Sequence, residues 1–376
     1  MKSIVYFTDL SAGPKENLLS KLGRLLEIAG LEKVVHKRDL VAVKLHFGEL
    51  GNTAYIRPVF FRKIVETIRK AGGDPFLTDA NTVYAGTRSD SVNHLQTAIH
   101  NGFSYSVVDA PIIIADGLRG KSEIAVEINQ KRFKKAYIGS EIVNADALIS
   151  IAHFKGHELS GFGGTIKNLG MGCASRKGKL AQHSSVSPKV ITKKCIGCED
   201  CVPHCSQHAI VVEKKKASIN PETCIGCGEC ILICPNSAIQ IQWNQSVPVF
   251  LENMAEYTMG VLQNKSQKAL FVNFITDISP ACDCYGHNDS PLVRNIGILA
   301  STDPVAIDQA SVDLVNREIA LPGSCLKENR GAGEDKFKGL YPYVDWTIQL
   351  DYAEQLGLGT RSYILEDLPP KTKEKK

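Results

Sequence analysis

The sequence predicts an α/β protein in which a mostly parallel sheet domain carries a small inserted α+β module. Up to about residue 186, short β-branched runs alternate with amphipathic stretches, which is the pattern of βα units. This pattern resumes after residue 244, and no linker rich in Gly, Ser or Pro announces a separate domain there. Eight of the 12 cysteines lie in between. We therefore predict a discontinuous α/β domain, residues 1–190 and 244–376, around a module of residues 191–243.

The elements of the α/β domain follow from these patterns. The expected strands are Ile4–Phe7, Leu40–His46, Pro75–Thr78, Ile112–Ala115, Ala147–His153, Ala269–Ile275 and Ile296–Ala300. The expected helices are Arg57–Ala71, Val92–His100, Val249–Leu262 and a helix up to Asn316. The first two of these helices are followed closely by glycines, which commonly end helices. Asp303 and Pro304 open the last one, because Asp is a favoured N-cap and Pro a favoured first helical residue.

Composition excludes several classes of protein. Of the 376 residues, 43% are hydrophobic and 22% are charged, as expected for a folded chain rather than a disordered one. The formal net charge of +4 is too small to indicate a nucleic-acid partner. Apolar runs are too short for a membrane span or a signal peptide. We therefore expect a cytoplasmic protein, in a compartment that keeps thiols reduced and free to bind metal.

The predicted module consists of an internal repeat. Residues 195–212 and 224–241 align at a period of 29, and each copy has the spacing Cys-x2-Cys-x2-Cys-x3-Cys. In this spacing three cysteines wrap one corner of a [4Fe-4S] cubane, and the fourth ligates the other cluster. The predicted ligands of one cluster are Cys195, Cys198, Cys201 and Cys234, and those of the second are Cys224, Cys227, Cys230 and Cys205. Gly197 and Gly226 lack a Cβ, which allows the tight turn of each loop.

The alternative for this repeat is zinc, which four thiolates from two cysteine pairs can bind. Each copy, however, supplies a third and a fourth cysteine at cluster spacing. The module, over about residues 190–243, resembles the bacterial two-cluster ferredoxins. Cys234 is followed by Pro235, as in that family, whereas Cys205 is followed by Ser206. This resemblance implies single-electron transfer through two clusters.

A second dense group of polar residues begins where the strand Ala147–His153 ends. It contains His157, Lys167 and His183. Gly161, Gly163 and Gly164 precede a predicted helix and could cradle an anion with their backbone N–H groups. Nucleotide-binding fingerprints are not matched, because Ile166 occupies the last glycine position of G-x-G-x-x-G. The alternative is a glycine-rich surface turn with solvated side chains.

Four motifs give the whole chain a resemblance to the prokaryotic iron–sulfur proteins of domain of unknown function 362. They are Lys155-Gly-His157, the glycine-rich run of residues 161–172, residues 277–284 and residues 296–308. More distantly, the segment from His157 to His183 is similar to the nickel-pincer lactate racemase family. That similarity implies His157 as an acid/base, Lys167 as the tether of an organic nickel cofactor and His183 as a nickel ligand. It therefore implies a further metal or organic cofactor near Lys167.

The remaining cysteines are Cys173, Cys282, Cys284 and Cys325. Cys282-Asp-Cys284, near His287, could bind a further metal, cycle as a dithiol, or be an ordinary reduced pair in a loop. In our first hypothesis the protein is an oxidoreductase, whose clusters deliver electrons to chemistry near Lys167, and a redox-active pair of Cys282 and Cys284 would give them a destination in the same chain. The expected partner is a redox protein or a small-molecule substrate. In the alternative it is a dedicated electron carrier or docking protein with no chemistry of its own. In a third interpretation the clusters are purely structural.

Overall fold

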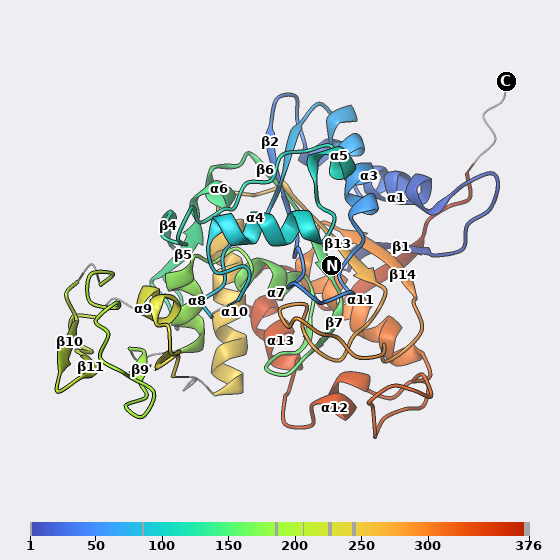
Figure 1. Cartoon of the computed structure of the whole chain (residues 1–376). Coiled ribbons are helices and arrows are strands. Elements are labelled where there is room, and N and C mark those ends of the chain that lie inside the picture. The colour runs from blue at the N-terminus through green and yellow to red at the C-terminus, as the bar shows by residue number, and fades with distance from the viewer. Residues whose placement is uncertain are drawn as a thin grey trace.

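A seven-stranded sheet forms the centre of the molecule (Figure 1). The computed structural model describes residues 2–84, 86–184, 187–205, 207–224, 228–242 and 246–371. In spatial order the strands are β15 (Tyr363–Asp367), β1 (Ser3–Asp9), β14 (Gly297–Ser301), β13 (Ala269–Ile275), β6 (Ala147–His153), β2 (Leu40–Lys44) and β3 (Asp74–Thr78). Only β14 runs antiparallel to its two neighbours, and the remaining pairs are parallel. The predicted α/β class with a mostly parallel sheet is confirmed.

Helices cover both faces of this sheet. The first face carries α1 (Leu18–Ile28), α2 (Leu31–Val34), α3 (Pro58–Lys70), α4 (Ser91–His100) and α5 (Tyr105–Val108). The other carries α7 (Thr165–Gly170) and α11 (Pro304–Arg317), with α10 (Val247–Leu262) and α13 (Thr347–Gln355) packed against them. Sheet residues alternate between two apolar cores: Leu270 and Val272 face α1 and α3, whereas Phe271 faces α11. Burial on both faces explains why β6 and β13 are mostly apolar.

Most of the expected elements are present. The bounds of β6 and β13 equal the predicted ones, and Asp303 caps α11 by accepting hydrogen bonds from the N–H groups of Val305 and Ala306. The expected strand Ile112–Ala115 is wrong. Its residues follow the edge of β3 but pair with it only at an isolated bridge between Leu77 and Ile112. Pro111 has no N–H to extend the pairing, and the chain turns away after Ala115.

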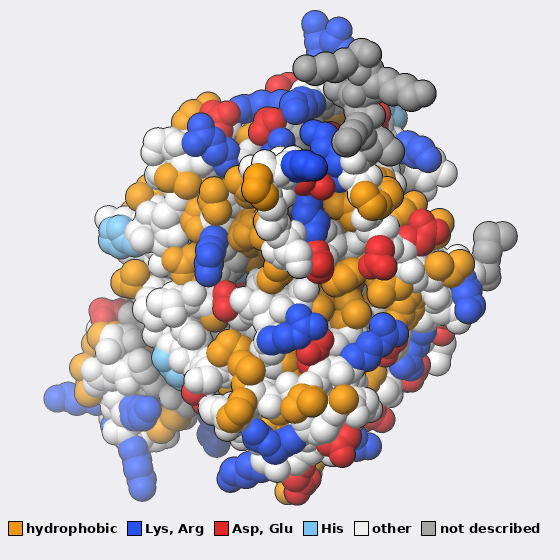
Figure 2. Space-filling view, turned by 90° about the vertical axis from the view of Figure 1, so that its right-hand side faces the viewer, with side chains coloured by type: hydrophobic (Ala, Val, Ile, Leu, Met, Phe, Trp, Pro, Cys, Tyr) orange, Lys and Arg blue, Asp and Glu red, His pale blue; other side chains and the backbone are white. Residues whose placement is uncertain are grey.

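Short elements complete the α/β part. They are the hairpin β4 (Glu123–Glu127) and β5 (Lys135–Gly139), α6 (Ser140–Asn144), the hairpin β7 (Lys155–His157) and β8 (Gly161–Gly163), α8 (Arg176–His183) and α12 (Lys336–Leu340). Basic and acidic side chains are interspersed with apolar ones on the face shown in Figure 2. Among the helices of the described residues, none is long and apolar enough to cross a membrane.

The two copies of the cysteine repeat fold alike. Their elements are β9 (Lys189–Val190), β10 (Ile210–Glu213), β11 (Lys216–Ile219), α9 (Glu229–Ile233) and β12 (Ile239–Gln240). β10 pairs with β11, and β12 pairs with β9 in the repeat-equivalent register. The N–H of Ile191 donates to the carbonyl of Ala238 (2.7 Å), and the N–H of Asn220 donates to that of Ala209 (2.8 Å). Because these two bonds are exact counterparts under the 29-residue shift, the halves are related by a pseudo-two-fold axis.

This repeat unit lies beside α8 at one side of the α/β part (Figure 1). Glu229, at the start of α9, anchors the repeat unit to the α/β part. Its carboxylate is 4% exposed and lies close to three cations of the α/β part. Arg119 lies at 3.2 Å, Lys121 at 3.1 Å and Arg176 at 3.5 Å from it. Val83 belongs to the same apolar cluster as the cysteines, so both polar and apolar contacts join the two parts.

Candidate functional site

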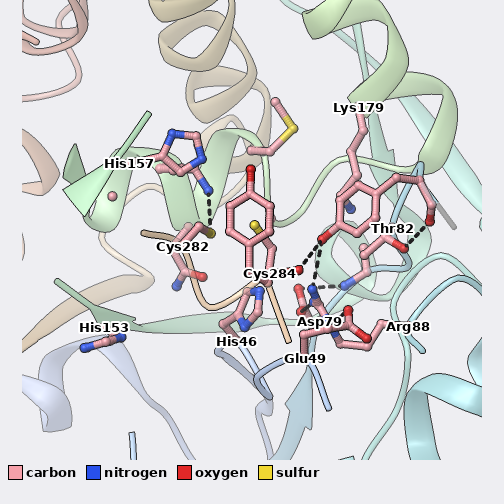
Figure 3. Close-up of a pocket in the computed structure, with 18 of the residues that line it drawn as sticks. His46, Glu49, Asp79, Thr82, Arg88, His153, His157, Lys179, Cys282 and Cys284 are labelled. Carbon is pink, nitrogen blue, oxygen red and sulfur yellow. Dashed lines mark hydrogen bonds and ion pairs between the residues drawn. The ribbon is translucent and has the colours of Figure 1, made fainter. Parts of the chain in front are cut away.

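A cavity of about 540 Å³ opens at the carboxyl ends of β2, β3, β6 and β13 (Figure 3). Lys44 ends β2, Asp79 follows β3, and His153 ends β6. The loop after β13 adds Cys282 and Cys284. This is the edge at which ligands bind in parallel sheets, since the loops that follow the strands converge there.

The cavity brings together the three residues predicted to carry chemistry. His157 from β7, Lys167 from α7 and His183 from the end of α8 all line it. His183 stacks on Phe250, with ring centroids 4.8 Å apart. Burial lowers the pKa of His183 to about 3, so its imidazole is neutral at physiological pH. Neighbouring Lys179, also buried, has a pKa lowered to about 8 by burial.

The three glycines have different surroundings. Gly163 and Gly164 line the cavity, whereas Gly161 adopts φ +76° and lies against Trp346. A Cβ on Gly164 would come within 2.3 Å of the Asp308 carboxylate. That carboxylate accepts hydrogen bonds from the N–H groups that begin α7, those of Thr165 and Ile166. These donors are therefore occupied within the protein, and cofactor binding by the glycines stays a prediction.

Cys282 and Lys167 are in direct contact. The ammonium of Lys167 donates to the sulfur of Cys282 at 3.5 Å. A hydrogen bond from Cys284, together with Lys167 and His157, lowers the pKa of the Cys282 thiol well below its usual value despite its burial. The pKa of Cys284 is raised, because it shares its proton with Cys282 and is itself buried. Burial alone would lower the pKa of Lys167, but the negative charge on the cysteine pair outweighs it and raises that pKa.

The orientation of His157 is fixed by its own loop. The backbone N–H groups of Leu159 and Ser160 donate to its Nδ1 at 3.2 and 3.3 Å. Nδ1 therefore accepts both hydrogen bonds from the loop backbone. The His157 side chain also hydrogen-bonds to Cys282.

Residues that the sequence did not reveal form the buried polar wall of the cavity. Lys44 lies 3.0 Å from Asp79, and Arg88 lies 3.1 Å from Glu49. Burial alone would raise the pKa of Asp79, but Lys44 and its other neighbours outweigh it and lower the pKa. A signal was available for two of these residues, because Lys44 ends an apolar strand and Asp79 follows one. His287, which the sequence places near Cys284, is not among the residues that line the cavity.

The cysteines of the repeat gather into the two predicted groups. Cys195, Cys198, Cys201 and Cys234 line one small cavity. Cys205, Cys224 and Cys230 line another. The eighth predicted ligand, Cys227, lies outside the described residues. Among the described cysteines, each group thus combines members of one copy of the repeat with the last cysteine of the other copy.

Backbone N–H groups point at the sulfurs of these cavities. The N–H of Ala209 donates to Cys205 and that of Ala238 to Cys234, both at 3.2 Å. The two bonds are counterparts under the 29-residue shift. The N–H of Ala217 donates to Cys195 at 3.3 Å. Such donors stabilise negative charge on sulfur, as a ligating thiolate requires.

Comparison with known families and structures identifies the family. The family model described as domain of unknown function (DUF362) matches residues 41–313. The chain belongs to the DUF362 family. A comparison with curated proteins finds no match for this DUF362 protein.

Two solved structures are similar to this DUF362 protein at low identity. One is the lactate racemase apoprotein from Thermoanaerobacterium thermosaccharolyticum, at 15% identity over 74% of this chain and 51% of that chain, with a TM-score of 0.39. The other is a crystal structure of a protein from Thermotoga maritima, at 10% identity over 70% of this chain and 52% of that chain, with a TM-score of 0.34. The DUF362 chain spans about half the length of each of these structures.

Proposed function

We propose that this protein is an iron–sulfur redox protein that transfers electrons through two [4Fe-4S] clusters to the cavity of its α/β domain. The observation that carries this proposal is the grouping of the repeat cysteines into two separate sets, each drawn from both copies. A mononuclear zinc site would instead draw its four ligands together around one ion. Among the described residues, no three His, Cys, Asp or Glu side chains are close enough to hold a single metal ion.

The residues fit two cubanes. Cys195, Cys198, Cys201 and Cys234 would hold one cluster, and Cys205, Cys224 and Cys230, with Cys227, the other. The N–H donors to the sulfurs of Cys195, Cys205 and Cys234 suit thiolates that carry cluster charge. Gly197 has φ +69°, and a Cβ there would lie 2.6 Å from the Cα of Lys215, so its loop can close only on glycine. When bound, such clusters exchange single electrons.

A short segment connects the second cysteine set with the large cavity. Gly228 lines the small cavity of that set, and a Cβ there would lie 3.4 Å from a methyl carbon of Val83. Val83 and Tyr84 both line the large cavity. The Tyr84 hydroxyl lies 3.5 Å from the carbonyl oxygen of Cys284, to which it donates. We therefore assign the set of Cys205, Cys224 and Cys230 as the one nearer to the candidate active site.

The nickel cofactor implied by the lactate racemase similarity fits this arrangement poorly. It requires the amine of Lys167 as a covalent tether, but that amine is held by the sulfur of Cys282. The nickel cofactor therefore has no part in the proposed reaction and remains a prediction from sequence.

Two variants separate an enzyme from an electron carrier. Protein is purified without oxygen, reduced with dithionite and examined by EPR before and after a substrate screen. We expect Cys198→Ala to lose the signal of one cluster and to lose turnover. Lys167→Ala is expected to keep both cluster signals and to lose turnover. Full turnover by Lys167→Ala would exclude Lys167 from the active site, and reducible clusters without turnover in the wild-type protein would leave a dedicated carrier. A chain that takes up no iron would refute the proposed function altogether.

A further inference from the structure

Cys282, which is buried, and Cys284, which is half-buried, are two cysteines that the proposed clusters do not use. The residue between them, Asp283, turns into the protein, where His153 Nδ1 lies 2.8 Å and Lys155 Nζ 3.3 Å from its carboxylate. The backbone carbonyl of Asp283 accepts a hydrogen bond from the N–H of Glu49 (2.9 Å). Because Asp283 is anchored in this way, the cysteines on either side of it both face the cavity (Figure 3).

The two thiols have different surroundings, which favour the charged form of Cys282 and the protonated form of Cys284. Lys155, His157 and Lys167 present positive charge or a hydrogen-bond donor to Cys282, and Cys284 donates its own hydrogen bond to it. Cys282 is thereby held as a thiolate, which is the nucleophilic form of cysteine. Cys284 keeps its proton while Cys282 is charged, because two adjacent thiolates would repel each other. A low-pKa thiol beside a protonated partner is the arrangement of dithiols that exchange with disulfides.

We propose that Cys282 and Cys284 form a redox-active dithiol that reduces small disulfides bound in the cavity, with Cys282 as the attacking group and Cys284 as the resolving group. The volume of about 540 Å³ admits a small-molecule disulfide. The cavity lining has more cations than carboxylates, which favours a substrate with carboxylate groups. The cations are Lys44, Arg88, Lys155, Lys167 and Lys179, and the carboxylates are Glu49, Asp79 and Glu158. A dithiol is favoured over a metal site, because among the described residues no three His, Cys, Asp or Glu side chains are arranged to hold one metal ion.

The reaction balances as two thiol–disulfide exchanges. The Cys282 thiolate attacks one sulfur of the disulfide R–S–S–R′, which forms the bond Cys282–S–S–R and releases R′–S⁻. Lys167 protonates this leaving group. The Cys284 thiol then gives its proton to Lys167 and attacks the sulfur of Cys282, which releases R–S⁻ to be protonated by water. The substrate gains two electrons, and Cys282 and Cys284 are oxidised to a disulfide.

Return to the dithiol needs two electrons and two protons. A donor of the one-electron iron–sulfur class supplies these electrons, and this part of the inference rests on the proposed function. The exchange itself needs no cluster, so the two can fail separately.

The test uses full-length protein kept free of oxygen and dithiodipropionate as the probe disulfide, with peptide mass mapping of each cysteine. Wild-type protein is expected to form a Cys282–Cys284 disulfide and to release two equivalents of mercaptopropionate. Cys284→Ser is expected to stop at a mixed disulfide on Cys282 with one equivalent released. Cys282→Ser is expected to lose at least about tenfold in rate. Cys325→Ser, which removes an exposed thiol, is the matched control and should behave as wild type.

Circular dichroism and iron content verify that each variant is folded. A wild-type chain that keeps the adduct without closing the disulfide, or a Cys282 that reacts no faster than Cys325, would overturn the dithiol. Stoichiometric metal that protects both thiols from reaction would also overturn it. Wild-type protein that takes up no iron but still exchanges with the disulfide would refute the proposed function and leave the dithiol standing. Full iron content with a Cys282 that does not react would overturn the dithiol and leave the proposed function standing.

Discussion

Replacing Gly197 by alanine tests the physical account of the cysteine loops. Gly197 adopts φ +69°, and its added Cβ would lie 2.6 Å from the Cα and 2.7 Å from the carbonyl carbon of Lys215. The left-handed conformation costs alanine about 1–2 kcal/mol, and steric overlap with backbone costs about 1–3 kcal/mol more. We therefore expect Gly197→Ala to lower the free energy of unfolding of the module by about 2–5 kcal/mol.

Two other glycines separate these contributions. Gly333 has φ +84° with nothing within 4 Å of its Cβ position, so Gly333→Ala reports the conformational cost alone. Gly323→Ala meets neither a contact nor a positive φ and should be close to neutral. The assay is a urea titration followed by circular dichroism and by the visible absorbance of the clusters, with iron content measured in parallel. A Gly197→Ala protein that unfolds at the same urea concentration as Gly333→Ala and keeps all its iron would refute the reasoning.

Three further perturbations address the site, the interface and the clusters. Lys167→Met should raise the midpoint of the pH profile for Cys282 alkylation by about 1–3 pH units, because a cation next to the thiolate is lost, whereas Lys167→Arg should keep it low; an unchanged midpoint in Lys167→Met would contradict this. Glu229→Gln should destabilise the contact between the two parts by about 3 kcal/mol, measured by urea titration, because it leaves buried cations without their partner. The exposed Glu222→Gln is the control and should have no such effect, and equal effects of the two would contradict the role of Glu229 as an anchor. Stripping the iron with a chelator should expose residues 191–243 to proteases and leave the seven-stranded sheet intact, and an unchanged cleavage pattern would argue against cluster-dependent folding.

The sequence predicts the centre of the sheet better than its edges. β6 and β13 are buried on both faces, so each is a mostly apolar segment whose ends are visible in the sequence. The edge strand β15 is only partly buried and has no comparable segment, so it was not predicted. The antiparallel direction of β14 was also not predictable from its residues, because direction depends on how the chain returns across the sheet.

The candidate site, like the sheet, could be predicted from the sequence only in part. His157, Lys167 and His183 lie in one segment that follows a strand, so their proximity could be predicted from the chain itself. The contact between Lys167 and Cys282 joins residues 115 positions apart, and it exists only because β6 and β13 are neighbours. The wall of Lys44 and Asp79 likewise depends on the order of β6, β2 and β3. Residue type reveals such groups, but the topology of the sheet decides which of them meet.

Iron and acid-labile sulfide, measured on protein purified without oxygen, test the central claim most directly. Two cubanes require about eight irons and eight sulfides per chain, together with EPR signals after reduction by dithionite. We predict this stoichiometry, with loss of about half of the iron in Cys195→Ser and no loss in Cys325→Ser. Four or fewer irons in the wild-type chain, or stoichiometric zinc in their place, would contradict the assignment of two clusters.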